Sequence, residues 1–576
     1  MKASWIALLC FALLGLLSLS QTSAKEARKL RTEDGSGVGI EVSSDFDNGV
    51  PSGAEPLHIT VHNNTGRPGT WLFEVNSNPF GEGIRSTVRI SLGAGQSRTV
   101  PFAAPLQRFH NLTVRASGPG TTGDTERFSY QSNGHGSSGE TQFLAMSREL
   151  SSRSWEPLKK ELEKGKKNFS AAQFDPVDLA PDWRGFSGVE WLSITREEWD
   201  KLDPAVRAAI RQWVGQGGHL AMAVREGASF PWNEFHLPSG GSRYGFGDIR
   251  AIPWDGKELS ATVLAPLITK NSPLFERLNQ PEGKNWSMRA ALGDLKPNVP
   301  LIVSFVIGFA VLVGPANLFI FAPAVRRHRM FWTTPLISLG GGLALIGVIL
   351  LQEGTGGTGR RYTLVNLLPE THEAVVWQDQ VARTGLLLGS GFQLCEEALV
   401  HPIPLDGNSG RSGRMNVEGM RYSGDWFRSR SIQAQHLAAI RPTRAAVTVT
   451  GTEASGAPIV VSSIGSPLKA LFLTDENGKS WGAKIVRTGE KTVLQPSSGK
   501  DIGFPQDIAS PARSTVDEIL KDRVAHPLPG TFVAAAADPM TEPMATLHSI
   551  RWKDDCVVYL GPVVNASKIQ TEGMQP

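Results

Sequence analysis

The chain has 576 residues, more than a single hydrophobic core normally supports, so several domains are expected. Its formal net charge is +3 with 20% charged residues, which argues against the concentrated basic footprint of a nucleic-acid-binding protein. The 61 glycines and 37 prolines favour β-rich domains with many turns.

The N-terminus has the three parts of a secretory signal peptide. Lys2 supplies a positive charge, the stretch from Ile6 to Leu17 is apolar, and Thr22 and Ala24 are the small residues of a cleavage site. The sequence therefore predicts a signal peptide over residues 1–24, removed after Ala24. An uncleaved anchor helix is the alternative.

Residues 25–139 contain short stretches of β-forming residues separated by turn signals. LHITVHN (57–63), TWLFEV (70–75) and NLTVRAS (111–117) are examples, and NNTG and GAGQ supply turns. A spacing of about ten residues between strands is typical of an immunoglobulin-like β-sandwich, which we predict here.

The pattern changes to alternating strands and helices over residues 140–297. Thr195 and Glu198 form a capping box after the apolar strand GVEWLSI. Asp203 and Pro204 start the next helix, Gly217 ends it, and the strand HLAMAV follows. A strand, a helix and a parallel strand form a right-handed crossover, so this region is predicted to be a doubly wound α/β domain.

This α/β segment resembles the class I glutamine amidotransferase-like domain of uncharacterised bacterial envelope membrane proteins. The residues that match the pattern of that domain are Leu202, Pro204, Ile210, Trp213, Val214, Gly217, Gly218 and Leu220. Active enzymes of the fold use a Cys nucleophile with a His and a Glu, but residues 140–297 contain no Cys. His219 and His236 therefore have no nucleophile to activate, and the resemblance implies a degenerate, inactive domain. The crevice outside the carboxyl ends of the strands is the ligand site that such a fold would offer.

Two long apolar runs lie at residues 298–352. No charged residue occurs from Val299 to Val325 or from Met330 to Gln352, and each run is long enough to cross a bilayer as a helix. Short cytoplasmic loops are rich in Arg, so the residues between the runs, Arg326, Arg327 and Arg329, are predicted to determine topology. The N- and C-terminal domains then lie outside the cytoplasm, which means the periplasm in a Gram-negative host.

The two predicted membrane helices carry small residues four positions apart. Ala310 with Gly314 and Ser338 with Gly342 permit close helix packing, either within the hairpin or on a partner. The Gly314-Pro315-x-Asn317 stretch also resembles the membrane hairpin of the same envelope proteins.

Residues 353–576 are predicted to form a C-terminal, mainly β domain. Cys395 and Cys556 are the cysteines that remain after signal removal, and an exported chain allows a disulfide between them; two free thiols are the alternative. Trp426 and Phe427 lie in an Arg-rich stretch that we interpret as a loop or helix covering the β domain, with a ligand face as the alternative.

Motifs for cofactors and metals lack their structural context. Gly354, Gly356 and Gly359 follow an apolar helix where a dinucleotide motif needs a strand, so they are interpreted as a flexible linker. His372-Glu373 is followed by Val376 where a zinc-protease motif needs its second His. No catalytic residue, cofactor or metal is predicted.

The sequence therefore indicates a non-enzymatic, membrane-anchored envelope protein that binds or scaffolds other envelope components. Membrane lipid and envelope proteins are the expected partners, and nucleic acid is not. A subunit of a membrane transport or sensing complex, and a hydrolase or transferase with an unrecognised active site, are the alternatives.

Overall fold

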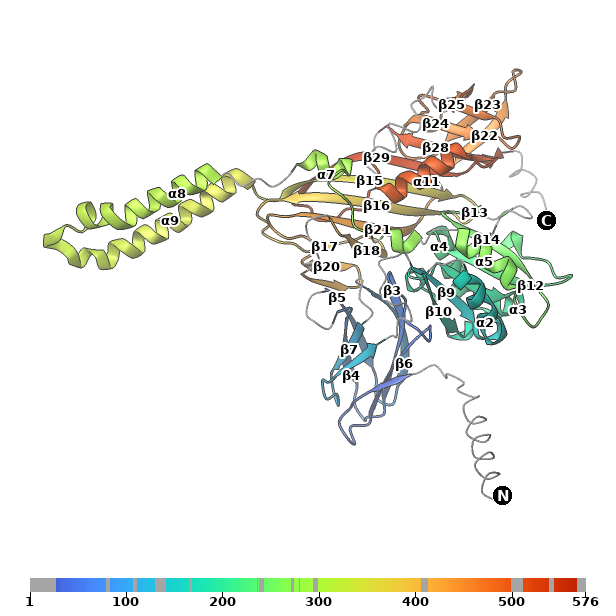
Figure 1. Ribbon diagram of the computed structural model, residues 1–576, viewed down its shortest axis with the longest axis horizontal. Coiled ribbons are helices and arrows are strands. Elements are labelled where there is room, and N and C mark those ends of the chain that lie inside the picture. The colour runs from blue at the N-terminus through green and yellow to red at the C-terminus, as the bar shows by residue number, and fades with distance from the viewer. Residues whose placement is uncertain are drawn as a thin grey trace.

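The computed structural model describes residues 27–78, 83–106, 111–129, 141–164, 168–235, 237, 243–270, 274–278, 280–293, 299–405, 413–498, 511–537 and 543–566. These residues form a multidomain, mostly β body with several sheets, from which two apolar helices project (Figure 1). The predicted signal peptide and His236 lie outside the described residues.

The N-terminal region packs two β-sheets face to face. The first sheet is antiparallel, in the order β1 (Arg28–Leu30), β2 (Val38–Ser44), β3 (Ala54–Asn63), β6 (Ser97–Pro105). The facing sheet contains β5 (Gly83–Leu92), β4 (Gly69–Asn76), β7 (Asn111–Ser117) and β8 (Thr125–Ser129). Buried and partly exposed residues alternate along β2, as they do in a strand with one face in the core. Trp71 and Phe73 fill the centre and are fully buried.

The facing sheet continues into residues from the other side of the apolar hairpin. Its full order is β17 (Phe392–Gln393), β20 (Arg421–Gly424), β19 (Arg414–Glu418), then β5, β4, β7 and β8. Strand β19 pairs in parallel with β5, so that Met415 lies opposite Ile84. The side chain of Ile84 belongs to the C-terminal core together with Val417 and Trp426. Residues before and after the hairpin therefore share one hydrogen-bonded sheet, which crosses the predicted boundaries at 139 and 353.

The α/β region has one six-stranded sheet. Its order is β10 (Asn168–Phe174), β9 (Thr141–Ser147), β11 (Trp191–Thr195), β12 (His219–Arg225), β14 (Gly247–Trp254), β13 (Arg243–Tyr244), and the pairs are parallel except at β13. Helices α2 (Arg148–Lys164) and α5 (Ala261–Lys270) pack on one face, and α4 (Pro204–Gly215) packs on the other. All five residues of β11 are buried, as expected for a strand covered on both faces.

The helix signals in this region are confirmed. Helix α3 (Arg196–Lys201) begins with the capping box of Thr195 and Glu198, and α4 has Asp203 as N-cap and Pro204 in its first turn. The remaining short elements of the region are η1 (Pro176–Asp178), η2 (Trp183–Phe186), η3 (Trp232–Phe235), α6 (Leu274–Leu278) and α7 (Ser287–Leu292).

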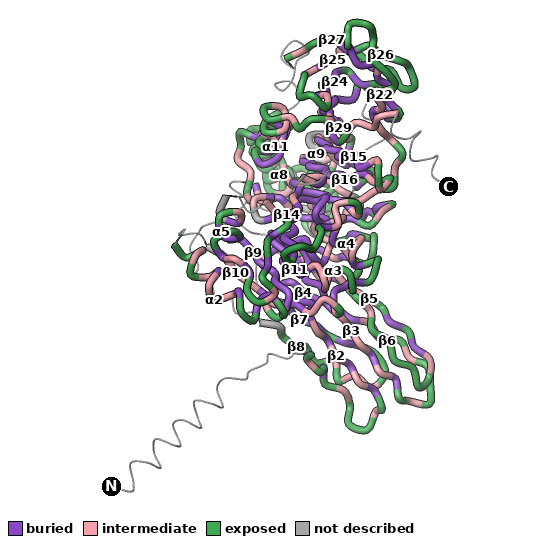
Figure 2. Tube along the Cα trace, turned by 90° about the vertical axis from the view of Figure 1, so that its right-hand side faces the viewer, coloured by how far each residue is buried: buried purple, intermediate pink, exposed green. Residues whose placement is uncertain are grey.

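The C-terminal region is built on a nine-stranded sheet. Its order is β18 (Ala398–Ile403), β21 (Ile432–Pro442), β16 (Glu373–Thr384), β15 (Gly357–Leu368), β29 (Ile550–Pro562), β28 (Thr531–Ala536), β24 (Leu468–Thr474), β25 (Ser480–Ala483), β27 (Gln495–Pro496). A four-stranded sheet of β26 (Lys491–Val493), β23 (Pro458–Ser462), β22 (Val447–Thr452) and β30 (Val564–Asn565) extends it, and α11 (Ser514–Ala525) packs beside it. Figure 2 shows buried residues along the centre of these layers.

One interpretation of this region is wrong, and one alternative is excluded. The glycine-rich stretch after the second apolar run is not a flexible linker, because β15 begins at Gly357 and pairs along its whole length with β16. Trp426 and Phe427 are each 1% exposed and lie in the core, in a turn that leads directly into strand β21. They therefore form no ligand face.

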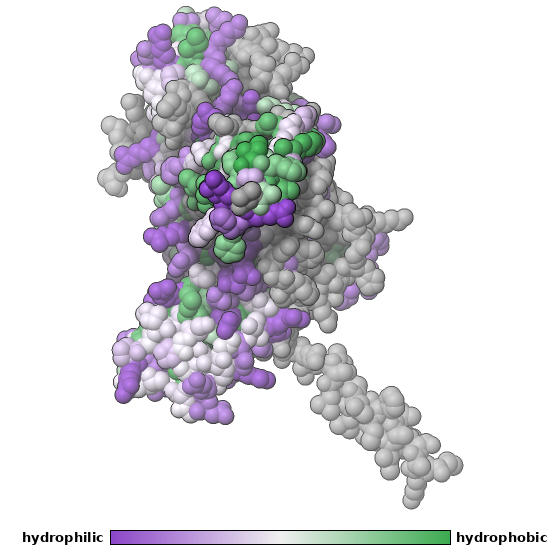
Figure 3. All heavy atoms as spheres, turned by 90° about the vertical axis from the view of Figure 1, so that its left-hand side faces the viewer, coloured by the Kyte–Doolittle hydropathy of each residue, from purple (hydrophilic) through white to green (hydrophobic). Residues whose placement is uncertain are grey.

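The hairpin consists of α8 (Val299–Val311), a π-helical segment η4 (Leu312–Phe321), the 3-10 segment η5 (Ala324–Arg329) and α9 (Met330–Glu353). Its two apolar spans, Val299–Phe321 and Arg326–Val348, have mean hydropathies of 2.3 and 1.5 and are long enough to cross a membrane. Phe319 and Ile320 are 73% and 70% exposed, which suits lipid and is unfavourable in water. Figure 3 shows this hydrophobic surface over the projecting hairpin.

A buried asparagine joins the two helices of the hairpin. Pro315 has no N–H to donate, and the backbone widens to π geometry, with the N–H of Ala322 donating to the carbonyl of Asn317 at 2.8 Å. Asn317 is fully buried: its Nδ2 donates to Thr334 Oγ1 at 2.9 Å, and Thr333 Oγ1 donates to its Oδ1 at 2.6 Å. These bonds satisfy polar groups that lipid could not.

The two helices approach each other closely at Gly341. A Cβ atom there would lie 2.4 Å from the ring of Phe309. In contrast, Ala310, Gly314, Ser338 and Gly342 are all exposed. These four residues therefore do not form the contact within the hairpin, and their packing on a partner stays a prediction.

We expect Gly341→Ala to separate the two helices, because its methyl group overlaps the Phe309 ring, whereas Gly342→Ala has open space around its Cβ. The distance between spin labels at Val306 and Leu343 should lengthen or broaden in the first variant only. Identical distance distributions in the two variants would contradict this contact.

Candidate functional site

The arginines that the sequence predicts to determine topology lie at the tip of the hairpin. Arg326, Arg327 and Arg329 belong to η5, the segment between η4 and α9, and are exposed. In Figure 1 this tip is the end of the hairpin farthest from the body. The arginines Arg360 and Arg361, at the other end of the hairpin, pair with Asp555 and Asp554 at 2.6 Å each, so their charges are largely neutralised.

The predicted disulfide does not form. Cys395 and Cys556 are both free thiols, the first exposed and the second buried. Cys556 lies within β29, opposite Tyr362 of β15, whereas Cys395 follows the edge strand β17 of another sheet. Burial raises the pKa of the Cys556 thiol to about 11, so it stays protonated and unreactive at neutral pH.

His219 is placed as a structural residue. Its ring stacks on Trp191 with 4.7 Å between centroids, and its Nδ1 lies 3.4 Å from Asp248 Oδ2. Burial would raise the pKa of Asp248, but His219 and the nearby arginines together lower it below its usual value. No Cys lies in the α/β region, so this His–Asp pair has no thiol to activate.

The carboxyl ends of β9 and β11, where a ligand crevice was expected, hold a closed hydrogen-bond group. Ser147 Oγ donates to Glu198 Oε2 at 2.7 Å, and the N–H of Thr195 donates to the same oxygen at 3.0 Å. Burial raises the pKa of Glu198, although these donors oppose that rise. These three polar groups are therefore committed to capping α3.

A buried ionic cluster joins the C-terminal sheet to the α/β region. Asp379 of β16 is bonded to His436 Nδ1 at 2.7 Å and accepts from Arg513 Nε at 3.1 Å, while Arg513 Nη1 donates to the carbonyl of Leu278 at 2.7 Å. Burial would raise the pKa of Asp379, but Arg513 and His436 together lower it. A buried charge is tolerated only when it is paired in this way.

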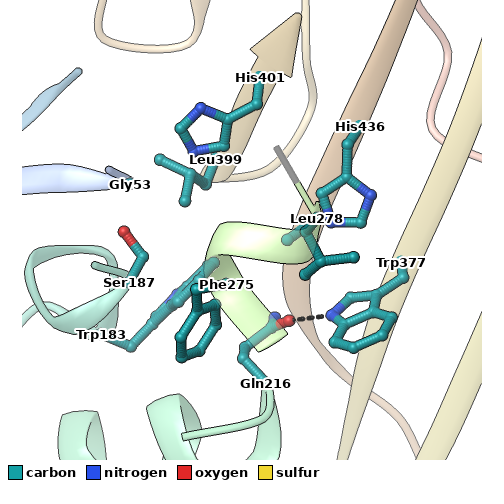
Figure 4. A pocket seen from close by; sticks show the side chains of 11 residues that line it. Gly53, Trp183, Ser187, Gln216, Phe275, Leu278, Trp377, Leu399, His401 and His436 are labelled. Carbon is teal, nitrogen blue, oxygen red and sulfur yellow. Dashed lines mark hydrogen bonds between the residues drawn. The ribbon is translucent and has the colours of Figure 1, made fainter. Parts of the chain in front are cut away.

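Beside this cluster lies a small cavity at the meeting point of all three regions (Figure 4). Its volume of about 20 Å³ has room for roughly one water molecule and none for a substrate. Gln216 lies at its floor, accepting from Trp377 Nε1 at 2.5 Å and donating to the carbonyl of Ala439 at 3.0 Å. The cavity therefore belongs to the packing contact between the three regions.

The large opening is a groove of about 880 Å³, here called the junction groove. It lies between the β13–β14 edge of the α/β sheet, the turn between β15 and β16, helix α11, and strands β28 and β29. Its volume is within the range of about 300–1,000 Å³ for ligand sites. It opens at the amino-terminal end of β14, opposite to the edge that the fold resemblance implies.

Arginine side chains give the junction groove its chemical character. Arg523 Nη2 donates to the carbonyl of Gly245 at 2.6 Å, and Arg243 Nη2 lies 3.3 Å from Asp522 Oδ2. Arg243 Nη1 is buried and has no hydrogen-bond acceptor among the described residues. Burial and the charge of Arg243 lower the pKa of Arg523 to about 9, which still leaves it cationic at neutral pH.

An unused guanidinium donor in a groove is suited to a carboxylate or phosphate oxygen. Asp248, Asp522 and Glu370 also line the groove, so it favours a ligand with one anionic group among polar ones over a polyanion. The described lining contains no His or Cys. Sequence reasoning missed this site because Arg243 and Asp522 are 279 positions apart.

The buried His401 lines the small cavity between the three regions, so the packing there can be tested by changing the pH. Burial lowers its pKa from 6.5 to about 3, so the folded state holds it neutral while the unfolded chain protonates it. Above pH 6.5 this residue does not reduce the free energy of unfolding. As the pH falls towards 3, protonation favours the unfolded chain and the free energy of unfolding decreases, by about 2 kcal/mol at pH 5.

We therefore expect His401→Gln to reduce the loss of thermal stability between pH 7.5 and pH 5, whereas His526→Gln, at a side chain 79% exposed, leaves it unchanged. Thermal unfolding in detergent at the two pH values measures this. An equal acid sensitivity of the wild type and the His401 variant would contradict the assignment.

Comparisons with known proteins give no family. No protein-family model matches the chain, and no curated protein matches it. Solved structures with a partial match include a Paenibacillus cycloisomaltooligosaccharide glucanotransferase (9% identity, 35% of this chain and 30% of that chain, TM-score 0.16) and the yeast delta-COP-I mu-homology domain (10% identity, 36% and 95%, TM-score 0.18). A β-glucuronidase of glycoside hydrolase family 2 matches at 9% identity over 89% of this chain and 61% of that chain, with a TM-score of 0.18. The chain thus spans less than a third of the glucanotransferase, and TM-scores this low support no conclusion about fold or activity.

Proposed function

We propose that this chain is a non-enzymatic, membrane-anchored envelope protein whose outward-facing domains bind or scaffold other envelope components. The observation that carries the proposal is the pairing of β5 with β19 across the apolar hairpin. Because the two flanks of the hairpin form one body, both flanks lie on the same side of any membrane that the hairpin crosses. The hairpin then enters and leaves the bilayer once each.

The charges of the hairpin support an orientation with its tip in the cytoplasm. Arg326, Arg327 and Arg329 are exposed at the tip, and short cytoplasmic loops are enriched in Arg. At the opposite end Arg360 and Arg361 are paired with aspartates, which removes their conflict with this orientation. A signal peptide at residues 1–24 would deliver the body to the outside, which is the periplasm in a Gram-negative host.

The domain assignments are part of the same proposal. The facing sheets of residues 27–129 support an immunoglobulin-like sandwich. Parallel strands with helices on both faces support a doubly wound, amidotransferase-like domain, and the missing Cys supports its being degenerate. The proteins that this α/β segment resembles are envelope membrane proteins, which agrees with a membrane-anchored arrangement.

The junction groove is the proposed binding site for an envelope component. Its volume, the buried unpaired Nη1 of Arg243 and the nearby Arg523 suit a ligand or protein segment that carries a carboxylate or phosphate. The groove is formed by residues from both sides of the hairpin, so it exists only in the assembled body.

A subunit role in a larger membrane complex is the second candidate. It is favoured by the exposure of Ala310 and Gly314 on one helix and of Ser338 and Gly342 on the other. Small residues at this spacing let another helix approach closely.

The binding proposal predicts a partner at the junction groove. A photo-crosslinking amino acid at Leu528, which is 37% exposed in the groove, should give a specific adduct in intact cells. The adduct should be lost in Arg243→Gln and kept in Arg487→Gln, whose side chain is 70% exposed in the C-terminal region. Mass spectrometry of the adduct identifies the partner.

The same crosslinking residue at Ile485, 67% exposed and absent from the groove lining, serves as the positional control. Recovery of the protein without an adduct at Leu528, or an adduct that Arg243→Gln does not reduce, would overturn the groove as the binding site.

A further inference from the structure

The base of the hairpin is hydrogen-bonded to a leucine-rich loop of the body. Gly354 ends α9 with a positive φ of 71°, and its carbonyl accepts from the N–H of Leu386 at 3.1 Å. Gly356 is bonded to the same loop twice: its carbonyl accepts from Gly385 at 2.8 Å and its N–H donates to Leu386 at 3.0 Å. We call residues 385–390, Gly-Leu-Leu-Leu-Gly-Ser, the leucine loop.

These bonds fix the position of the leucine loop along the axis of the hairpin. Gly354 follows the last apolar residue of α9, Leu351, by three residues, which is about 5 Å along a helix. Leu388 is two residues from Leu386, so it lies at most about 7 Å farther away. The polar interface on each side of a bilayer core is about 5–8 Å thick. A bilayer around the hairpin therefore places Gly385 and Leu386 at its interface and leaves Leu388 within about 12 Å of the hydrocarbon core.

The leucine loop has an apolar side chain that the body does not cover. Leu388 is 90% exposed, whereas its neighbour Leu387 packs partly against the C-terminal core. A single exposed leucine is ordinary on a soluble surface. Here it lies two residues from Leu386, which is bonded to the end of the exposed apolar helix α9.

Cationic side chains surround the same place. Arg383 of β16 and Arg551 of β29 are both register partners of Thr358 on β15, so they share one face of the sheet about 10 Å apart. This row is one residue inside the edge at Gly357, where β15 starts after the hairpin. Arg430 is exposed, and its N–H donates to the carbonyl of Gly385 at 2.9 Å.

The acidic groups nearest along the same strands are already used. Asp554 and Asp555 of β29 pair with Arg361 and Arg360, farther from the hairpin. The leucine loop itself contains no acidic residue. An apolar side chain flanked by Arg is the pattern with which proteins contact anionic lipid surfaces.

We propose that the leucine loop, with Arg383, Arg430 and Arg551, is a membrane-contacting surface in which Leu388 enters the bilayer interface and the arginines bind anionic lipid headgroups. This inference rests on the proposed membrane anchoring. It adds a second contact beside the hairpin, which restrains the tilt of the body on the membrane and so holds the domains at a set height.

The test uses the full chain in lipid nanodiscs, with Cys395→Ser to remove the exposed thiol. An environment-sensitive fluorophore is attached to Leu388→Cys, to Leu343→Cys in α9, or to Ile485→Cys on the body. Each of these side chains is at least 62% exposed, so labelling does not disturb packing. We expect the emission of the Leu388 label to shift to the blue and to be quenched by lipids brominated near the headgroup. The Ile485 label should show neither effect.

The charge dependence separates lipid headgroups from other occupants. In phosphatidylglycerol discs the blue shift at Leu388 should exceed that in phosphatidylcholine discs. This additional blue shift should disappear in a variant in which Arg383, Arg430 and Arg551 are all replaced by Gln. It should remain when only the distal Arg487 is replaced by Gln. An equal shift in the two lipids, or one that appears only when a second protein is added, overturns headgroup binding.

The Leu343 label distinguishes failure of this inference from failure of the anchoring. A lipid-like Leu343 label with a water-like Leu388 label overturns the leucine loop as a membrane contact and leaves the hairpin as a membrane anchor. Water-like emission at both positions overturns the membrane anchoring, and the leucine loop falls with it.

Discussion

The arrangement of the molecule depends on the parallel pairing of β5 with β19. Strand β5 precedes the apolar hairpin and β19 follows it, with about 330 residues between the paired positions Gly83 and Arg414. Closing so long a loop is entropically costly, although the cost grows only with the logarithm of its length. Burial of Ile84 in the C-terminal core, with Met415 and Val417, offsets that cost. The pairing makes the two flanks of the hairpin a single body.

A second constraint acts deeper in the body, where charged groups replace apolar ones at the joint between regions. Asp379, His436 and Arg513 are nearly fully buried and pair with one another, while Gln216 connects Trp377 to the backbone of β21. Such a cluster contributes little net stability, but breaking it would leave an uncompensated buried charge. It therefore favours one relative placement of the regions, and with it the shape of the junction groove.

Local signals in the sequence predicted local structure well. The capping box at Thr195, the N-cap at Asp203 and the two charge-free apolar runs depend on residues within one turn or one helix of each other, and all of them appear in the structure. Contacts between distant segments left no such signal. Neither the sheet shared by β5 and β19 nor the groove formed by Arg243 and Arg523 has a periodicity or spacing that a single sequence displays.

The hairpin shows the same limit at close range. Several glycines could have formed the helix contact, and spacing alone favoured Gly314 and Gly342, but rotation of the helices presents Gly341 to Phe309. The disulfide was expected from the even number of cysteines and their shared C-terminal region, which say nothing of the different sheets near which Cys395 and Cys556 lie. Asn317 was noted only as part of a motif, and its partners Thr333 and Thr334 follow from the fold of the hairpin.

The most direct test of the account is the sidedness of the two flanks relative to the hairpin tip. In cells, with Cys395→Ser, single cysteines at Glu41 before the hairpin, at Ile485 after it and at Ala324 in its tip would be treated with a membrane-impermeant maleimide that reaches the periplasm. The account predicts labelling of the first two in intact cells, and of the tip only after the cytoplasmic membrane is opened. Labelling of one flank without the other, or of the tip in intact cells, would contradict it.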